Sequence, residues 1–365
     1  MDGQKLKQAL TLVLGCTKSD VVIQRFSDTV YVGASGLRSH AIVSFADKGD
    51  DVKVVITETS ARDIVKQIRK SKKVEVLYDD EHVVSSFVMD DKNNFSYASM
   101  DLDSKTLKGM TMHLTKDTAF KTSGTLLGNA LALVLNFAPK DAGDVRFTGC
   151  HLTVKDNTVE LMSTDNQAVA IYKFRCTDST EAKTILPKEA SSFAKLMFGE
   201  LEVGIKPGFF FFKGTDGDFS SIVVLQTFYQ DDDSTPLLPY QRAIVEPFVS
   251  NEPEYRFSIG AEELKESMED VLPFTNPIHK DAYVRLEGGK FSVTSSTETN
   301  KGYTESDKLN YPYTEVRTLR LGIPAMLKII NNYKGDYIEV VVYNNRYLIK
   351  NGEGLDVYGT IMLSS

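Results

Sequence analysis

The chain has 365 residues, of which 42% are hydrophobic and 25% charged, enough to bury two or three cores. No apolar run approaches the roughly 18 residues that a membrane-spanning helix needs, and Met1–Gly15 lacks a signal-peptide layout, so we expect a cytoplasmic protein. The formal net charge of −8 implies that the molecule as a whole repels nucleic acid, unless its basic residues gather on one face.

The first third of the chain is predicted to alternate helices with strands. Gln4–Leu14 places Leu6, Leu10 and Leu14 at helical spacing. The remaining elements predicted here are strands at Val21–Phe26, Thr29–Gly33, Ala41–Phe45 and Val52–Thr57, a helix at Ser60–Lys70, and strands at Val74–Tyr78, His82–Met89 and Phe95–Met100.

The rest of the chain follows the same plan. Asp231–Pro236 is predicted to be a solvated turn that closes the middle third, and the last third begins near Asn251. Helices are predicted at Thr122–Phe137, Pro187–Phe198, Ala261–Leu272 and Pro324–Tyr333, and the strands include Glu200–Ile205, Phe209–Phe212 and Ser221–Phe228.

One supersecondary unit recurs about every 130 residues. An apolar residue, a glutamate and a valine open a strand at Glu75, Glu202 and Glu339, and the helix and strand upstream of each keep nearly the same offset. Three elements in one order indicate three copies of one domain. We therefore predict an α+β fold, with two helices packed on antiparallel sheets in each of three domains, 1–112, 113–249 and 250–365.

The sequence shows no catalytic constellation. Cys150 and His151 are adjacent rather than spaced for zinc, and Asp216-Gly217-Asp218 lacks the rest of a calcium loop. We expect no enzyme activity, metal or cofactor. The three cysteines are expected to be buried structural thiols in a reducing compartment, and the five histidines to take solvent-facing positions.

The strongest charge feature is a basic segment in the first third. Arg62–Lys73 holds six basic residues against Asp63, a segment charge of +5 in an acidic protein. Such a segment is either a phosphate-binding surface or an ordinary solvated helix face.

Several strings resemble one family. Leu161–Ala170 (LMSTDNQAVA) resembles its "ATDGHRLA" segment, and Asn94–Met100 (NFSYASM) is similar to its "RFSLSTL" strand. Val271–Asn276 (VLPFTN) and Pro239–Ile244 (PYQRAI) are similar to its "ILSN" and "PDYRRVLP". Together with the three-part length, these strings resemble the bacterial β sliding clamp, the processivity factor of replicative DNA polymerases, in a divergent form that suggests a phage or mobile-element protein.

The resemblance implies an assembly. In the family, two chains join head to tail, first domain to third, to make a closed ring with helices lining the hole. Phe95 and Tyr97 match the first-domain side of that interface, and Pro273 and Phe274 match the third-domain side. The alternative is that these four residues belong to the internal core.

The resemblance also implies weak, sequence-independent contact with double-stranded DNA through phosphates, because base-specific bonds would stop sliding. One helix argues against uniform contact, since Glu262–Asp270 is acidic. The basic residues expected at the pore are Lys5, Lys7, Arg62, Lys66, Arg69, Lys70, Lys72, Lys73, Lys121, Lys188, Lys195, Lys328 and Lys334.

In the family, DNA polymerase and an ATP-driven clamp loader dock short peptides, with a glutamine and apolar anchors, between the second and third domains. The chain departs from the family at Asn166–Ala168, where the family has Gly-His-Arg, and at its tail, whose rival explanation is completion of a strand. The positions that match this pocket are Phe147, Thr164, Asn166, Gln167, Ala168, Val169, Arg242, Ala243, Ile361, Met362 and Leu363.

Two other functions remain open from the sequence. The first is a clamp-like scaffold for DNA processing that forms another ring or none, which the mass in solution distinguishes. The second is a β-rich multidomain hydrolase with its site between domains, which perturbed carboxylates in a deep pocket would favour.

Overall fold

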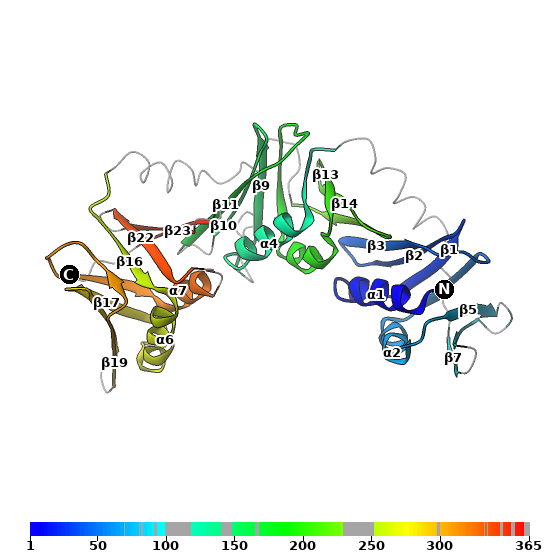
Figure 1. Cartoon of the computed structure of the whole chain (residues 1–365), viewed down its shortest axis with the longest axis horizontal. Helices are drawn as coiled ribbons and strands as arrows, with labels where there is room; N and C mark the ends of the chain where they lie inside the picture. The colour runs from blue at the N-terminus through cyan, green and yellow to red at the C-terminus, as the bar shows by residue number, and fades with distance from the viewer. Residues whose placement is uncertain are drawn as a thin grey trace. The chain divides into compact units, whose positions relative to one another are not determined.

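The computed structural model (Figure 1) describes most of the chain. The described residues are 1–68, 70–79, 81, 83–90, 93–98, 118–139, 148–164, 168–228, 252–297, 300–331, 333, 335–343, 346–351 and 355–360. Among them no helix is long and apolar enough to cross a membrane.

The chain forms two compact units, and the division runs through its middle third. The first unit comprises Met1–Ala132, His151–Val159 and Arg175–Thr235, and the second comprises Leu133–Cys150, Glu160–Phe174 and Pro236–Ser365. The three domains predicted at 1–112, 113–249 and 250–365 therefore remain a prediction.

The described helices are short. They are α1 (Gly3–Leu14), α2 (Glu58–Ile68), α4 (Gly124–Leu135), the 3-10 helix η1 (Lys188–Leu196), α6 (Ala261–Val271), the 3-10 turn η3 (Leu272–Phe274) and α7 (Ile323–Ile330).

Strands make up most of the remainder. In the first third they are β1 (Val21–Phe26), β2 (Thr29–Ser35), β3 (Ser39–Ala46), β4 (Val52–Ile56), β5 (Val74–Asp79), β6 (Val84–Met89) and β7 (Asn93–Ala98). They continue with β8 (Phe120–Ser123), β9 (Gly149–Lys155), β10 (Thr158–Thr164), β11 (Ala168–Arg175), β12 (Ala182–Pro187), β13 (Glu200–Lys206), β14 (Phe209–Asp216) and β15 (Phe219–Gln226). The last are β16 (Tyr255–Gly260), β17 (Asp281–Glu287), β18 (Lys290–Ser296), β19 (Lys301–Ser306), β20 (Leu309–Asn310), β21 (Arg317–Gly322), β22 (Tyr337–Tyr343), β23 (Arg346–Asn351) and β24 (Leu355–Thr360).

One arrangement recurs along the chain. Each of α2, α4, η1, α6 and α7 follows a strand and precedes three strands that are neighbours in one sheet. For α2, α4, α6 and α7, the strand before the helix pairs with a strand outside the three that follow it. These pairs are β4 with β1, β8 with β13, β16 with β22 and β21 with β17. Before α1, an isolated bridge between Asp2 and Lys73 takes the place of such a strand. The mixed α and antiparallel β architecture agrees with the predicted class.

The strands form four sheets. Their orders are β4-β1-β2-β3-β15-β14-β13-β8, β12-β9-β10-β11-β24-β23-β22-β16-β20, β19-β18-β17-β21 and β5-β6-β7. Two pairings join segments far apart in sequence. β3 pairs with β15 from Ser39↔Leu225 to Phe45↔Phe219, and β11 pairs with β24 from Ala168↔Gly359 to Tyr172↔Leu355.

The helices bury their apolar stripes against these sheets. Asp2 caps α1, because its Oδ1 accepts hydrogen bonds from the backbone N–H groups of Gln4 and Lys5, both at 2.9 Å. Leu6 and Leu10 of α1 are fully buried and the helix contacts β2 and β3. Burial of each such leucine contributes roughly 1.5–3 kcal/mol.

One helix differs from its prediction. The segment predicted as a helix at Pro187–Phe198 is the 3-10 helix η1. The hydroxyl of Ser191 donates to the Lys188 carbonyl at 3.0 Å and that of Ser192 to the Glu189 carbonyl at 2.7 Å. Such local bonds compete with the α-helical pattern.

α4 and η1 approach each other closely at two glycines. A Cβ built at Gly124 would lie 2.5 Å from the carbonyl carbon and oxygen of Met197, and one at Gly128 would lie 3.2 Å from the carbonyl oxygen of Ala194. Only a residue without a side chain fits against backbone at the first of these distances.

Replacing Gly124 with valine is therefore expected to destabilise the protein. The new side chain forces α4 away from the Met197 backbone, which costs about 1–3 kcal/mol of unfolding free energy. Urea denaturation followed by circular dichroism measures the loss. Thr125→Val, on the exposed side of α4, is the matched control and is expected to stay within about 0.5 kcal/mol of the parent. Equal midpoints for the two variants would contradict the close approach.

Candidate functional site

The basic segment in the first third begins on α2 and continues into the connection to β5. Arg62 and Lys66 are exposed on α2, and each has an acidic neighbour: Arg62 bonds Glu58 at 2.7 Å and Lys66 bonds Asp63 at 3.1 Å. These pairs reduce the positive charge that the helix itself presents. Arg69 lies outside the described residues.

The remaining positive charge of this segment lies beyond the helix. Lys70, Lys72 and Lys73 are all exposed. Asp90 accepts hydrogen bonds from the backbone N–H groups of Lys72 and Lys73, both at 3.0 Å. These hydrogen bonds, of which the one from Lys73 has the largest effect, hold the pKa of Asp90 below its usual range. The turn carrying the three lysines is thus fastened through its backbone, and their side chains point to solvent.

The two candidates on α1 are only half-exposed. Lys5 forms an ion pair with Asp218 at 2.6 Å, and this bond raises the pKa of Lys5. The pair joins α1 to the β14–β15 turn. Lys7 is half-buried on the same helix.

The candidates in the later thirds are fewer and more scattered. Lys121 lies on the strand β8, not on a helix, and pairs with Asp178 at 2.8 Å. Lys188 and Lys195 lie on η1, and Lys328 on α7 places its ammonium 6.0 Å from the ring centroid of Phe137. Lys334 lies outside the described residues. α4 carries no charged residue at all.

The acidic stretch of the last third lies on α6. Glu262, Glu266, Glu269 and Asp270 are exposed and Glu263 is half-buried, and the only basic residue of the helix, Lys265, is 3.5 Å from Glu262. The candidate cations are therefore concentrated in the turn that follows α2, at Lys70, Lys72 and Lys73.

An apolar cluster contains one described residue of the predicted peptide pocket, Val169. Val169 packs with other buried side chains of β10, β11, β22 and β23, and the half-buried Tyr343 borders them. The other buried members are Met162, Ile171, Val341 and Leu348. The residues of this group that the sequence did not indicate as pocket residues are Met162, Ile171, Val341, Tyr343 and Leu348. The sequence signal for these residues was the alternation of apolar positions within β22. The cluster is brought together by the pairing of β11 with β24, which links segments almost 190 residues apart.

Two further pocket candidates are described. Thr164 and Ala168 are buried, and the Thr164 hydroxyl donates to the Ala168 carbonyl at 2.9 Å. The candidates outside the described residues are Phe147, Asn166, Gln167, Arg242, Ala243, Ile361, Met362 and Leu363. β24 ends at Thr360, so the strand that leads to the tail lies beside β11.

Two of the four candidate interface residues lie on an end strand, and the other two lie on the turn η3. Phe95 and Tyr97 are half-buried on β7, the end strand of its sheet, and Tyr97 meets Phe87 edge to face with ring centroids 6.1 Å apart. Pro273 is exposed and Phe274 is half-buried on η3. A Cβ at Gly302 would lie 2.6 Å from the Phe274 ring, so this ring packs on β19, again an end strand.

One histidine contradicts its prediction. His279 is exposed and His40 is half-buried, but His151 is only 3% exposed, so the solvent-facing position predicted for it is wrong. β9, which carries His151, is buried on both faces along Gly149–Leu152, and a strand covered on both sides does not alternate polar with apolar. His82 and His113 lie outside the described residues.

The cysteines are free thiols, and no group of three or more potential metal ligands occurs among the described residues. Cys150 and Cys176 are buried, as predicted, whereas Cys16 is only partly buried because it follows the end of α1. Burial raises the pKa of Cys16 and of Cys150 to about 12.

Thiol reagents are therefore expected to modify the native protein slowly. With a pKa of about 12, only about one Cys150 thiol in ten thousand is ionised at pH 8. Absorbance titration with a disulfide reagent should show three fast-reacting thiols in guanidinium and slow reaction in buffer. Cys150→Ser should remove one equivalent from the unfolded count and leave the slow native reaction unchanged. A native rate equal to that of a free thiol would contradict these pKa values.

Comparison with known proteins adds fold-level evidence. No protein-family model and no curated protein sequence matches the chain. Solved structures do match over its whole length. DNA polymerase III subunit beta from Pseudomonas aeruginosa is similar with a TM-score of 0.80 at 11% identity, covering 100% of this chain and 99% of that one.

Two further structures agree. DNA polymerase III subunit beta from Borrelia burgdorferi, in complex with a natural product, gives a TM-score of 0.79 at 12% identity, covering 100% of this chain and 98% of that one. The Helicobacter pylori beta clamp bound to a DNA ligase peptide gives a TM-score of 0.77 at 14% identity, covering 100% of this chain and 99% of that one. The chain thus has the fold of the bacterial β sliding clamps, at a sequence identity that marks it as divergent.

Proposed function

We propose that two copies of this chain close into a ring around duplex DNA and act as a sliding clamp that tethers a polymerase to its template. The observation that carries the proposal is the likeness to sliding clamps over 100% of this chain. In this proposal the chain comprises three clamp domains, 1–112, 113–249 and 250–365, and the role is not enzymatic. The recurrence of strand, helix and three strands supports the domain count.

The proposed ring closes head to tail. β7 and β19 are end strands of their sheets, and an end strand presents backbone groups that a second chain can pair with. Phe95 and Tyr97 of one chain would meet Pro273 and Phe274 of the next. An assembly that repeats this contact twice is closed, so it leaves none of these edges exposed.

Contact with DNA in this proposal is weak and independent of sequence. Lys70, Lys72 and Lys73 supply the largest share, and the other exposed cations on α2 and η1 add to it. Retention then depends on encirclement, and a separate ATP-driven loader would open the ring. We place the protein in the cytoplasm with this machinery, and its divergence is in keeping with a phage-encoded clamp.

Retention on closed and open DNA tests the ring. After loading by a clamp loader and ATP, the protein should co-elute with circular plasmid in gel filtration and be lost when the plasmid is cut once. Only a topological link responds to a free end. Equal retention on both forms would show adhesion instead of encirclement and would overturn the proposal.

Partner proteins are proposed to dock at the apolar cluster around Val169. The half-buried Tyr343 offers a short peptide with apolar anchors an aromatic contact at the border of this buried cluster. A DNA ligase peptide is bound to the Helicobacter pylori clamp, which has the same fold. A polymerase and a clamp loader are the partners proposed here.

Tyr343→Ala is expected to weaken peptide binding about tenfold, or about 1.4 kcal/mol, because a half-buried aromatic at the border of an apolar cluster can anchor a peptide. Fluorescence anisotropy with a labelled peptide of about ten residues, carrying one glutamine and apolar anchors, measures the change. Tyr337→Ala, at the other end of β22 and 45% exposed, is the matched control. The same affinity for both variants would place the docking site elsewhere.

A further inference from the structure

A cleft in the first unit carries a charge opposite to that of the protein. It has a volume of about 480 Å³ and lies between β9 and β12 on one side and the end of β13 on the other. Three lysines, Lys155, Lys183 and Lys206, and one acid, Glu181, line it. The local charge is thus +2 in a chain whose net charge is −8.

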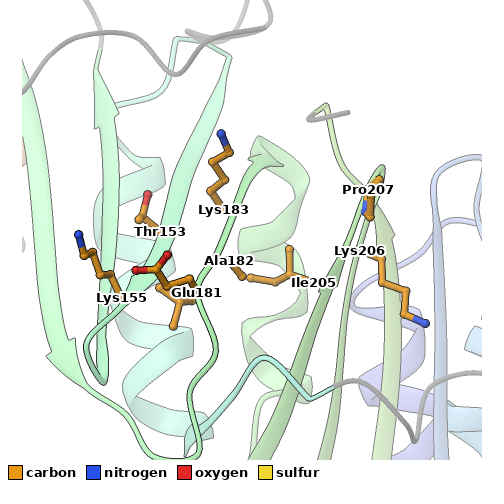
Figure 2. A pocket seen from close by; sticks show the side chains of 9 residues that line it. Thr153, Lys155, Glu181, Ala182, Lys183, Ile205, Lys206 and Pro207 are labelled. Atoms are coloured by element: carbon orange, nitrogen blue, oxygen red, sulfur yellow. The ribbon is translucent and has the colours of Figure 1, made fainter. Parts of the chain in front are cut away.

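The floor of the cleft is apolar. Ala182 and Ile205 are half-buried, and in Figure 2 they lie between Lys155 on one side and Lys206 on the other. Lys155 and Lys183 are exposed and Lys206 is half-exposed. A ligand here would therefore contact aliphatic surface below and ammonium groups around it.

Two strand ends border the same cleft. β12 is the end strand of its sheet order. β8 pairs with β13 only from Glu200 to Val203, so Gly204 and Ile205 extend beyond that pairing. The edge of an end strand, and a strand segment beyond its pairing, present backbone N–H and C=O groups. An extended peptide can form hydrogen bonds with these groups.

We propose that this cleft binds an extended acidic peptide of a partner protein. Alternate side chains of an extended peptide point to opposite sides. Acidic side chains can therefore meet Lys155, Lys183 and Lys206 while apolar side chains lie on Ala182 and Ile205. The site is separate from the apolar cluster around Val169 and does not depend on ring closure.

The chemistry favours a peptide over a nucleic acid strand. A phosphate backbone carries a negative charge at each residue and would meet the Glu181 carboxylate in the wall of the cleft. It also lacks the alternating donors and acceptors that strand edges pair with. An acidic peptide can place an apolar residue opposite Glu181.

Binding of a labelled peptide tests the proposal on the full chain. The probe is a capped peptide of about eight residues that alternates glutamate with valine, followed by fluorescence anisotropy in low salt. Lys155→Glu with Lys183→Glu is expected to weaken binding at least tenfold. Lys213→Glu, an exposed lysine of β14 away from the cleft, should change it less than twofold. Circular dichroism checks that each variant is folded.

Four results would overturn the proposal. A glutamine–valine peptide that binds as well as the acidic one would remove the role of charge. An oligothymidine that binds in place of the peptide, with the same loss in the double variant, would assign the cleft to nucleic acid. Peptide binding that appears only after Asp231–Asp233 are replaced by asparagine would assign it to the chain's own acidic run. Absence of binding up to millimolar peptide would also count against it.

Discussion

Replacing Lys70, Lys72 and Lys73 together with glutamate is expected to abolish most of the affinity for duplex DNA. These three exposed lysines follow α2 in the most basic segment of the chain, while the cations on the helix itself are paired with Glu58 and Asp63. Each lost phosphate contact should lower the slope of log affinity against log salt by about 0.9, so the triple variant should lose about 2.7 from the slope. We expect binding at low salt to weaken by roughly two orders of magnitude.

Fluorescence anisotropy with a duplex of about 30 base pairs, repeated over a range of salt concentrations, measures both quantities. The matched control reverses three exposed lysines outside the segment: Lys48, Lys173 and Lys213. It carries the same change in net charge, so a general electrostatic effect would appear in both variants. If the two triple variants lose the same affinity and the same slope, the turn after α2 is not the DNA-contacting surface.

Introducing aspartate at both Phe95 and Tyr97 is expected to convert the proposed dimer to a monomer. Both side chains are half-buried on the end strand β7, where they would contact the next chain, and a charge in that contact would have to be desolvated. The proposed ring contains this contact twice, so four large apolar contacts at about 2 kcal/mol each are lost, which raises the dissociation constant about a millionfold. Light scattering after gel filtration should change from about twice 40.6 kDa to 40.6 kDa.

Phe26→Asp is the control for this experiment. Phe26 is 49% exposed at the end of β1, so its replacement removes an exposed aromatic without touching β7. It should remain a dimer and should be retained on circular DNA like the parent. A parent that is monomeric at micromolar concentration would contradict the ring itself, whereas a dimeric double variant would contradict only the proposed contact.

Elements with short-range signals were predictable from the sequence. The spacing of Leu6, Leu10 and Leu14 predicted α1 to within one residue, and the strand containing Glu339 appears as β22. The same order of helices and strands could be recognised about every 130 residues because the apolar residues of each element follow the periodicity of a helix or a strand. The mixed α and β class followed from these elements.

Features that depend on distant partners were not predictable. The ion pair of Lys5 with Asp218 joins residues 213 positions apart and reduces the charge expected on α1. Val169 and Leu348 meet only because β24 pairs with β11. His151 is buried because both faces of β9 are buried along this segment. The strand therefore shows no alternation of polar and apolar residues that would have indicated the burial.

The pairing of β3 with β15 has a consequence for synthesis. The ribosome completes β3 at Ala46 but does not add Phe219–Gln226, its neighbour, until about 180 residues later. At about 5–20 residues per second, the nascent chain carries an unsatisfied β3 edge for on the order of ten seconds or more. β11 waits similarly for β24, which follows it by about 180 residues. Production in a heterologous host will therefore depend on chaperone capacity during elongation more than on the stability of the finished molecule.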